Sequence, residues 1–149
     1  MRATLAEALK TALKAGDKRR TSTLRLIQAA IQDRDIAQRG AGKDAVTDDE
    51  ILQILTKMVK QRQESAKAFE DGNRLELAAQ ERDESAIISE FLPKQMSEDE
   101  VREAAKAAIA EVGAEGLRDM GRAMAVLKER YPGQMDFGKA SGIIKQLLQ

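Results

Sequence analysis

The scarcity of proline is the feature that most constrains this fold, because a proline inside a helix removes a backbone hydrogen bond and clashes with the preceding turn. Only Pro93 and Pro132 occur in 149 residues, while good helix formers such as Ala, Leu, Glu, Lys, Gln and Arg dominate the chain. Apolar residues also recur at helical spacing almost throughout. The sequence therefore predicts an all-α protein.

Residues 1–92 carry signals for an N-terminal bundle of about four helices. Thr4 and Glu7 have the pattern of a capping box opening a short helix that stops at Gly16, and Asp17 can cap a second helix reaching about Gly40. A capping box at 47–50 begins a long helix ending at 71–72, and a fourth helix is expected over about 74–91. The apolar stripes contain Leu24, Ile27 and Ile31 in the second helix, Ile51, Ile54, Leu55, Met58 and Phe69 in the third, and Leu77, Ile88 and Phe91 in the fourth.

A domain boundary is predicted at residues 91–96, because Pro93 cannot continue a helix and residues 97–100 form another capping box. Three helices are expected beyond it, over about 98–112, about 119–131, and from Asp136 to the end, with Asp136 as the cap of the last. The predicted organisation is a helical domain over 1–92 and a three-helix domain over 93–149.

The amino-acid composition excludes most kinds of catalytic site. The chain has no His and no Cys, which excludes imidazole acid–base catalysis, thiol chemistry and zinc ribbons, and no nucleotide-binding glycine motif is present. The acidic runs at 48–50 and 98–100 fit the first turns of helices and lack the spacing of a calcium loop. We therefore expect no catalytic residue, metal or cofactor in this chain. Without an apolar run that could span a bilayer or act as a signal peptide, the expected location is the cytoplasm, away from membranes.

One charged residue falls on an apolar stripe of the first domain. At about 100° per residue, Arg62 lies among the apolar residues of the third helix, and Glu84 lies in the stripe of the fourth. We predict that Arg62 pairs with Glu84, with Glu81 as the alternative acceptor. Such a pair either fixes helix register or belongs to a catalytic site, and we favour the structural interpretation.

Gly121 lies within a helical pattern, where a glycine costs about 1 kcal/mol relative to alanine. This cost suggests that the space is needed, either because a neighbouring helix packs closely or because a ligand backbone approaches. Gly142 in the last helix invites the same two interpretations.

Charge is unevenly distributed in the second domain. Residues 93–116 contain three basic and six acidic side chains, whereas 117–149 contain six basic and three acidic ones. The basic residues are candidate phosphate contacts, although a solvated face is the alternative. They are Arg118, Arg122, Lys128, Arg130, Lys139 and Lys145. With only three Phe and one Tyr in the chain, recognition of the nucleic-acid backbone and shape is expected instead of base stacking.

The chain also resembles YqeY-like members of the GatB/YqeY family over essentially its whole length. The resemblance is carried by residues 23–27, 47–51, 60–62, 73–74, 81–84, 91–97, 111–114 and 119–124, and by Gly133 with Asp136. One departure is Phe137, which stands where the family often has Gly directly after the aspartate. Phe137 would anchor the last helix or alter the surface that a tRNA meets.

This resemblance implies an all-helical protein whose C-terminal part is similar to the tail domain of the B subunit of a tRNA-dependent amidotransferase, the domain that reaches the tRNA body. The family is labelled with carbon–nitrogen ligase activity using glutamine as amide donor. The catalytic sites of that enzyme lie in other domains and subunits, so the expected function is non-catalytic contact with tRNA. The alternative is an adaptor that docks on an amidotransferase or synthetase without nucleic acid, and an autonomous ligase is a third, disfavoured hypothesis.

Overall fold

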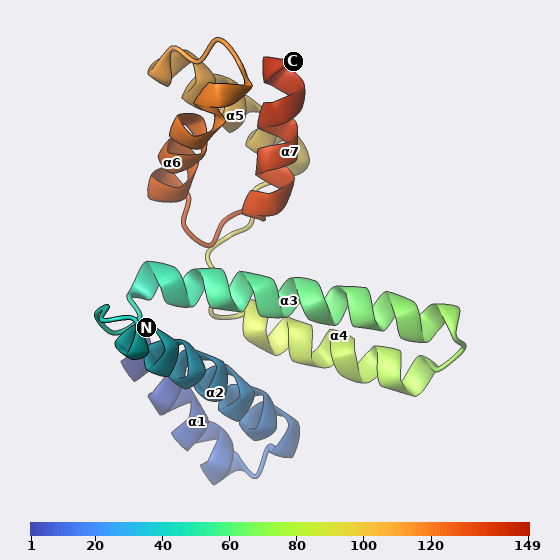
Figure 1. The fold of residues 1–149 in the computed structure, drawn as a ribbon. Coiled ribbons are helices and arrows are strands. Elements are labelled where there is room, and N and C mark those ends of the chain that lie inside the picture. Colours follow the sequence, from blue (N-terminus) through green and yellow to red (C-terminus); the bar gives the residue numbers. More distant parts are fainter. The chain divides into compact units, whose positions relative to one another are not determined.

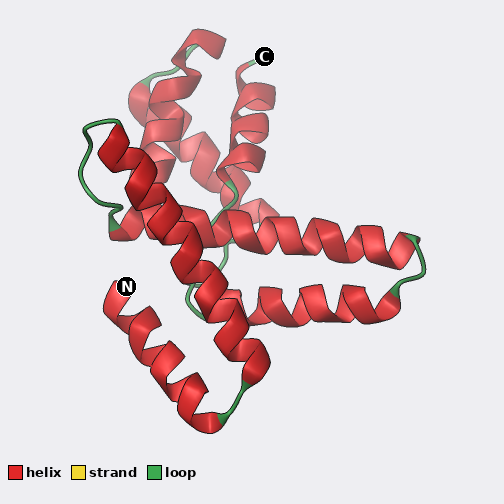
Figure 2. Ribbon diagram, turned by 60° about the horizontal axis from the view of Figure 1, so that its bottom comes forward, coloured by secondary structure: helices red, strands yellow, loops and turns green.

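The computed structural model describes residues 1–149 and confirms an all-α protein, with seven α-helices, one short 3-10 segment and no strand (Figure 2). The chain divides into two compact units, Met1–Leu92 and Pro93–Gln149. None of the helices is both long and apolar enough to cross a membrane.

The first unit is built from two helical hairpins (Figure 1). Its helices are α1 (Arg2–Ala15), α2 (Lys18–Gly40), α3 (Asp48–Asp71) and α4 (Leu75–Ser89). Helices α1 and α2 pair with each other, and α3 and α4 pack along their length. The two hairpins meet mainly through α2, which contacts both α3 and α4.

Local signals account for most helix ends in this unit. Gly16 ends α1 with a φ of 70°, a left-handed conformation that glycine adopts without strain. The Asp17 carboxylate accepts a hydrogen bond from the Arg20 amide and caps α2. Thr47 and Glu50 form the predicted capping box at the start of α3. These three predictions are confirmed.

The capping box predicted at Thr4 is wrong, because α1 begins at Arg2 and Met1 precedes it without a side-chain cap. The Leu5 amide already donates to the Met1 carbonyl, so Thr4 lies inside the first turn. Arg2 is held from outside the helix, since its guanidinium donates to both carboxylate oxygens of Asp35 at 2.8 and 2.9 Å and to the Val46 carbonyl at 3.1 Å. The first residue of α1 is therefore held by a long-range contact and not by a local cap.

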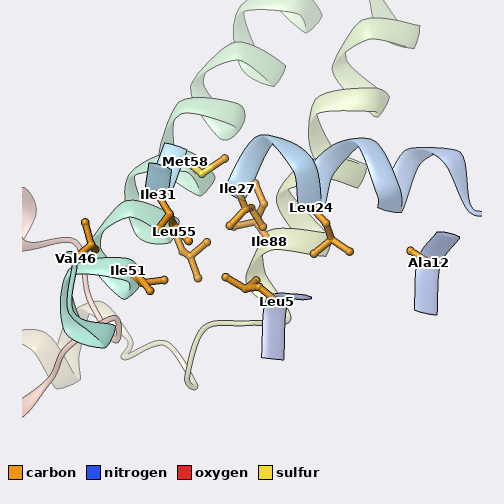
Figure 3. Close-up of a cluster of buried hydrophobic side chains, with 10 residues drawn as sticks. All are labelled: Leu5, Ala12, Leu24, Ile27, Ile31, Val46, Ile51, Leu55, Met58 and Ile88. Carbon is orange, nitrogen blue, oxygen red and sulfur yellow. The ribbon is translucent and has the colours of Figure 1, made fainter. Parts of the chain in front are cut away.

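The core of the first unit gathers where the two hairpins meet (Figure 3). It contains Leu5, Ala12, Leu24, Ile27, Ile31, Val46, Ile51, Leu55, Met58 and Ile88. The predicted stripes of α2 and α3 supply most of it. Leu77 does not join it and is 38% exposed, because α3 and α4 run on past the other hairpin in both overall views (Figures 1 and 2). No third helix covers the α4 stripe at that end.

The second unit has three packed helices, α5 (Glu98–Val112), α6 (Met120–Arg130) and α7 (Phe137–Leu148), with the 3-10 segment η1 (Leu117–Asp119) before α6. Ser97 and Glu100 form the predicted capping box of α5, and Asp136 caps α7 by accepting from the Gly138 amide at 2.9 Å. The segment after Pro93 is tied to the α6–α7 loop, since the Met96 amide donates to the Gln134 carbonyl at 2.8 Å.

Candidate nucleic-acid interface

The six basic residues predicted as phosphate contacts differ in whether they already have a partner. Arg122 pairs with Asp119 at 3.3 Å, and Arg130 on α6 pairs with Glu111 on α5 at 2.5 Å. Asp119 also accepts a hydrogen bond from the Glu115 amide, which lowers the pKa of its carboxyl and keeps it charged beside Arg122. These two guanidinium groups are therefore partly neutralised within the chain.

The other four, Arg118, Lys128, Lys139 and Lys145, are exposed and form no ion pair. Two of them do not share one face of their helix. Lys139 and Lys145 are six residues apart on α7, so their side chains point about 120° apart around the helix axis. The helix geometry thus separates these two basic residues, which the sequence count did not reveal.

A groove of about 580 Å³ runs along the second unit between the start of α5 and α7. Apolar, polar and charged side chains from both helices and from the preceding loops line it. They are Gln95, Met96, Glu98, Val101, Arg102, Met135, Asp136, Lys139, Gly142, Ile143 and Gln146. Lys139 is the one predicted basic residue among them.

Arg102 is the groove residue that sequence reasoning missed, because it lies in the acidic stretch 93–116. It is half-buried and forms no ion pair. Its place directly after Val101, a buried residue in the first turns of α5, was the available signal. Arg102 and Lys139 together offer two cations to an anionic group, while Asp136 is committed to capping α7 and Glu98 lies in the first turn of α5.

Neither glycine singled out in the sequence is packed against a neighbouring helix. A Cβ added at Gly121 or Gly142 would meet nothing within 4 Å, so the interpretation of close helix packing inside this chain is wrong for both. Gly121 lies exposed in the first turn of α6, and Gly142 faces the groove beside Lys139. The second interpretation, approach of a ligand backbone, stays a prediction.

The ion pair predicted in the first unit is present. Arg62 Nε donates to Glu84 Oε2 at 3.2 Å, which joins α3 to α4, and Arg62 Nη1 also donates to the Met58 carbonyl at 3.4 Å. The Arg62 and Glu84 side chains are 15% and 14% exposed. The pair lies just beyond Met58, where the apolar core ends. Its geometry is that of a contact that fixes the register of two helices.

The acidic runs lie where their sequence context suggested. Asp48, Asp49 and Glu50 occupy the first turn of α3, and residues 98–100 occupy the first turn of α5. Carboxylates in this position favour the positive end of the helix dipole. No group of three or more potential metal-ligating side chains is assembled in the structure.

Comparison with known protein families identifies the family of the chain. The family model described as Yqey-like protein matches residues 2–148, which is nearly the whole chain and includes both units. No curated protein matched the sequence. Because the match covers far more than half of its length, the chain belongs to the YqeY-like protein family.

Proposed function

We propose that this chain is a non-catalytic helical module of tRNA-dependent amidotransferase biology, and that its C-terminal unit contacts the tRNA backbone. The observation that carries the proposal is the pair of unpartnered cations, Arg102 and Lys139, in a groove that Gly142 leaves open. Lys and Arg side chains at such a surface bind phosphate oxygens, and a glycine permits close approach of a backbone. The resemblance to the amidotransferase tail domain supplies the class of RNA.

The proposed contact recognises the charge and the shape of the tRNA backbone. Arg118, Lys128 and Lys145 are exposed and would extend the contact to phosphates outside the groove. The one Tyr and three Phe of the chain offer little surface for stacking on unpaired bases. Binding is therefore expected to depend on salt and to be nearly insensitive to RNA sequence.

The test is binding of purified full-length protein to total tRNA at two salt concentrations. We expect the double variant Arg102→Glu/Lys139→Glu to weaken binding at least about ten-fold and to reduce the slope of log K against log salt by about 1–2. The control is Lys57→Glu/Lys67→Glu, which makes the same charge change at two exposed, unpaired lysines of α3. Equal losses in the two variants, or no binding of the unmodified protein at low salt, would contradict the proposal.

The second candidate is a protein adaptor that docks on an amidotransferase or synthetase without nucleic acid. The ion pairs of Arg122 and Arg130 favour it, as does the balance of 25 basic and 25 acidic residues in the chain. An adaptor would bind a purified amidotransferase or synthetase and would ignore tRNA at every salt concentration. Glutamine- and ATP-dependent amidation of a charged tRNA by the isolated chain would contradict both candidates.

A further inference from the structure

The first unit carries a second groove, at the closed end of the α1–α2 hairpin, that has no role in the function proposed above. It has a volume of about 520 Å³ and lies between the last turn of α1 and the side of α2 that faces away from the core. Two leucines line it while remaining largely exposed, with Leu13 at 51% and Leu26 at 43%. Apolar side chains that gather in one hollow with polar residues around them are a feature of interaction surfaces.

The turn that closes the hairpin keeps this groove open. Gly16 adopts a φ of 70° and nothing lies within 4 Å of the position its Cβ would take. Thr21 and Ser22 from the first turns of α2 add hydroxyl groups to the wall. The connection between α1 and α2 is visible in Figure 2 as a short loop with no other element of the first unit over it.

Charge gathers strongly at this end of the hairpin. Between residues 10 and 25 the sequence has six basic residues and a single acidic one, Asp17, whose carboxylate is engaged in capping α2. Two of the six turn toward α4, where Arg19 pairs with Asp83 at 2.5 Å and Arg20 with Glu90 at 2.6 Å. These pairs leave the opposite side of α2 with the unpaired cations.

Two of the remaining four cations line the groove. Lys18 and Arg25 line it, and Lys10 and Lys14 are exposed on the last two turns of α1, on either side of Leu13 in the sequence. None of the four forms an ion pair. The groove therefore combines two partly exposed leucines with two unpaired cations, Lys18 and Arg25, among its lining residues.

From this combination we infer that the α1–α2 groove docks an acidic amphipathic helix of a partner protein. Leu13 and Leu26 would contact the apolar face of that helix, and the cations that line the groove would pair with its Asp and Glu residues. A phosphate backbone would satisfy the cations but gives the leucines no apolar partner. A bilayer surface is too broad to enter a hollow between two helices. Charge complementarity with apolar anchors thus selects a peptide.

The test uses a synthetic peptide and the full-length protein. The probe is a dye-labelled helical peptide with leucines at i, i+3 and i+7 and glutamates on its other faces, and binding is followed by fluorescence anisotropy. We expect Leu13→Ala/Leu26→Ala to weaken binding about ten-fold, because the two truncations together remove about as much apolar contact as one fully buried leucine makes. Lys18→Glu/Arg25→Glu is expected to weaken it at least as much and to flatten the salt dependence.

Two matched variants and one matched peptide serve as controls. Lys57→Glu/Lys67→Glu makes the same charge change on α3, and Leu75→Ala removes a leucine that is 62% exposed at the far end of the other hairpin. Both should bind the probe as the unmodified protein does. A peptide of identical composition whose leucines are scattered around the helix should bind at least about ten-fold more weakly. Far-UV circular dichroism verifies that each variant is folded.

Several results would overturn the inference. Absence of peptide binding at low salt would overturn it. Equal affinity for the peptide with scattered leucines would also overturn it, because binding would then depend on charge alone. If total tRNA binds the protein and loses that binding in Lys18→Glu/Arg25→Glu, or phosphatidylserine vesicles bind it and lose that binding in Leu13→Ala/Leu26→Ala, the surface serves nucleic acid or membrane instead. The Arg102→Glu/Lys139→Glu variant separates this surface from the proposed tRNA contact, because it should leave peptide binding unchanged.

Discussion

Each unit has its own buried cluster, so a cavity made in one cluster should destabilise that unit alone. Leu55 and Leu127 are both fully buried, at 0% exposure, Leu55 in the first cluster and Leu127 in the second. Truncating a buried leucine to alanine costs about 2–5 kcal/mol. At roughly 4–8 °C per kcal/mol for a domain of this size, Leu127→Ala should lower the melting temperature of the second unit by about 8–40 °C.

The chain contains a natural reporter for this experiment. Tyr131 is the only tyrosine, there is no tryptophan, and its ring packs against the cluster of the second unit. Tyrosine fluorescence therefore follows the second unit, whereas circular dichroism at the helical minimum follows both. We expect Leu127→Ala to move the fluorescence transition and Leu55→Ala to leave it in place while shifting the larger dichroism transition.

A milder substitution guards against a second unit that no longer folds. Ile144 is also 0% exposed in the second cluster, and Ile144→Val should cost about 1 kcal/mol and shift the fluorescence transition by roughly 5 °C. If Leu55→Ala moves the Tyr131 transition as far as it moves the dichroism transition, the two units unfold as one and the reasoning is refuted.

Three further predictions concern polar contacts. Glu84→Ala leaves the part-buried Arg62 without its carboxylate and should lower the free energy of unfolding in urea by about 1–3 kcal/mol. The double variant Arg62→Met/Glu84→Leu should recover most of that loss, and equal losses in the two variants would contradict this reasoning. The Arg2 guanidinium lowers the pKa of Asp35 from 3.8 to about 2. The contribution of the Asp35 carboxylate to stability is therefore present above pH 4 and disappears as the pH falls toward 2. The urea midpoint of Asp35→Asn should therefore fall less between pH 5 and pH 2 than that of the unmodified protein, and an equal fall in both would contradict this. Ser97→Ala removes the α5 cap and should lower the urea midpoint of the Tyr131 transition by an amount equivalent to about 1 kcal/mol, while Ser89→Ala, at the last residue of α4, should not.

Helix limits were predictable because their causes are local. The cap at Asp17, the boxes at Thr47 and Ser97, and the left-handed Gly16 each depend on backbone groups within about four residues. The failure at Thr4 has the opposite cause, since α1 is extended by Arg2 reaching Asp35, 33 residues away. A contact of that separation leaves no periodic mark in the sequence.

The candidate surfaces were predictable only in part. The excess of basic residues after residue 117 was visible, and so was the pairing of Arg62 with Glu84, because both follow from composition and from helical periodicity. The groove that brings Arg102 to Lys139 was not visible, because these residues lie on different helices and only their packing places them together. The same holds for Leu13 and Leu26 at the α1–α2 groove.

By itself, the sequence determined the helical class, most of the helix ends and the apolar stripe of each helix, since each of these is settled by a residue and its near neighbours. The tertiary structure decided which parts of a stripe are covered and which cations remain unpaired. Leu77 shows the difference, because its spacing marks it as core while the α1–α2 hairpin does not cover that end of α4. Arg130 shows it as well, because its carboxylate partner Glu111 comes from the neighbouring helix. Periodicity gives a side chain its direction, and the length and placement of other helices decide what it meets there.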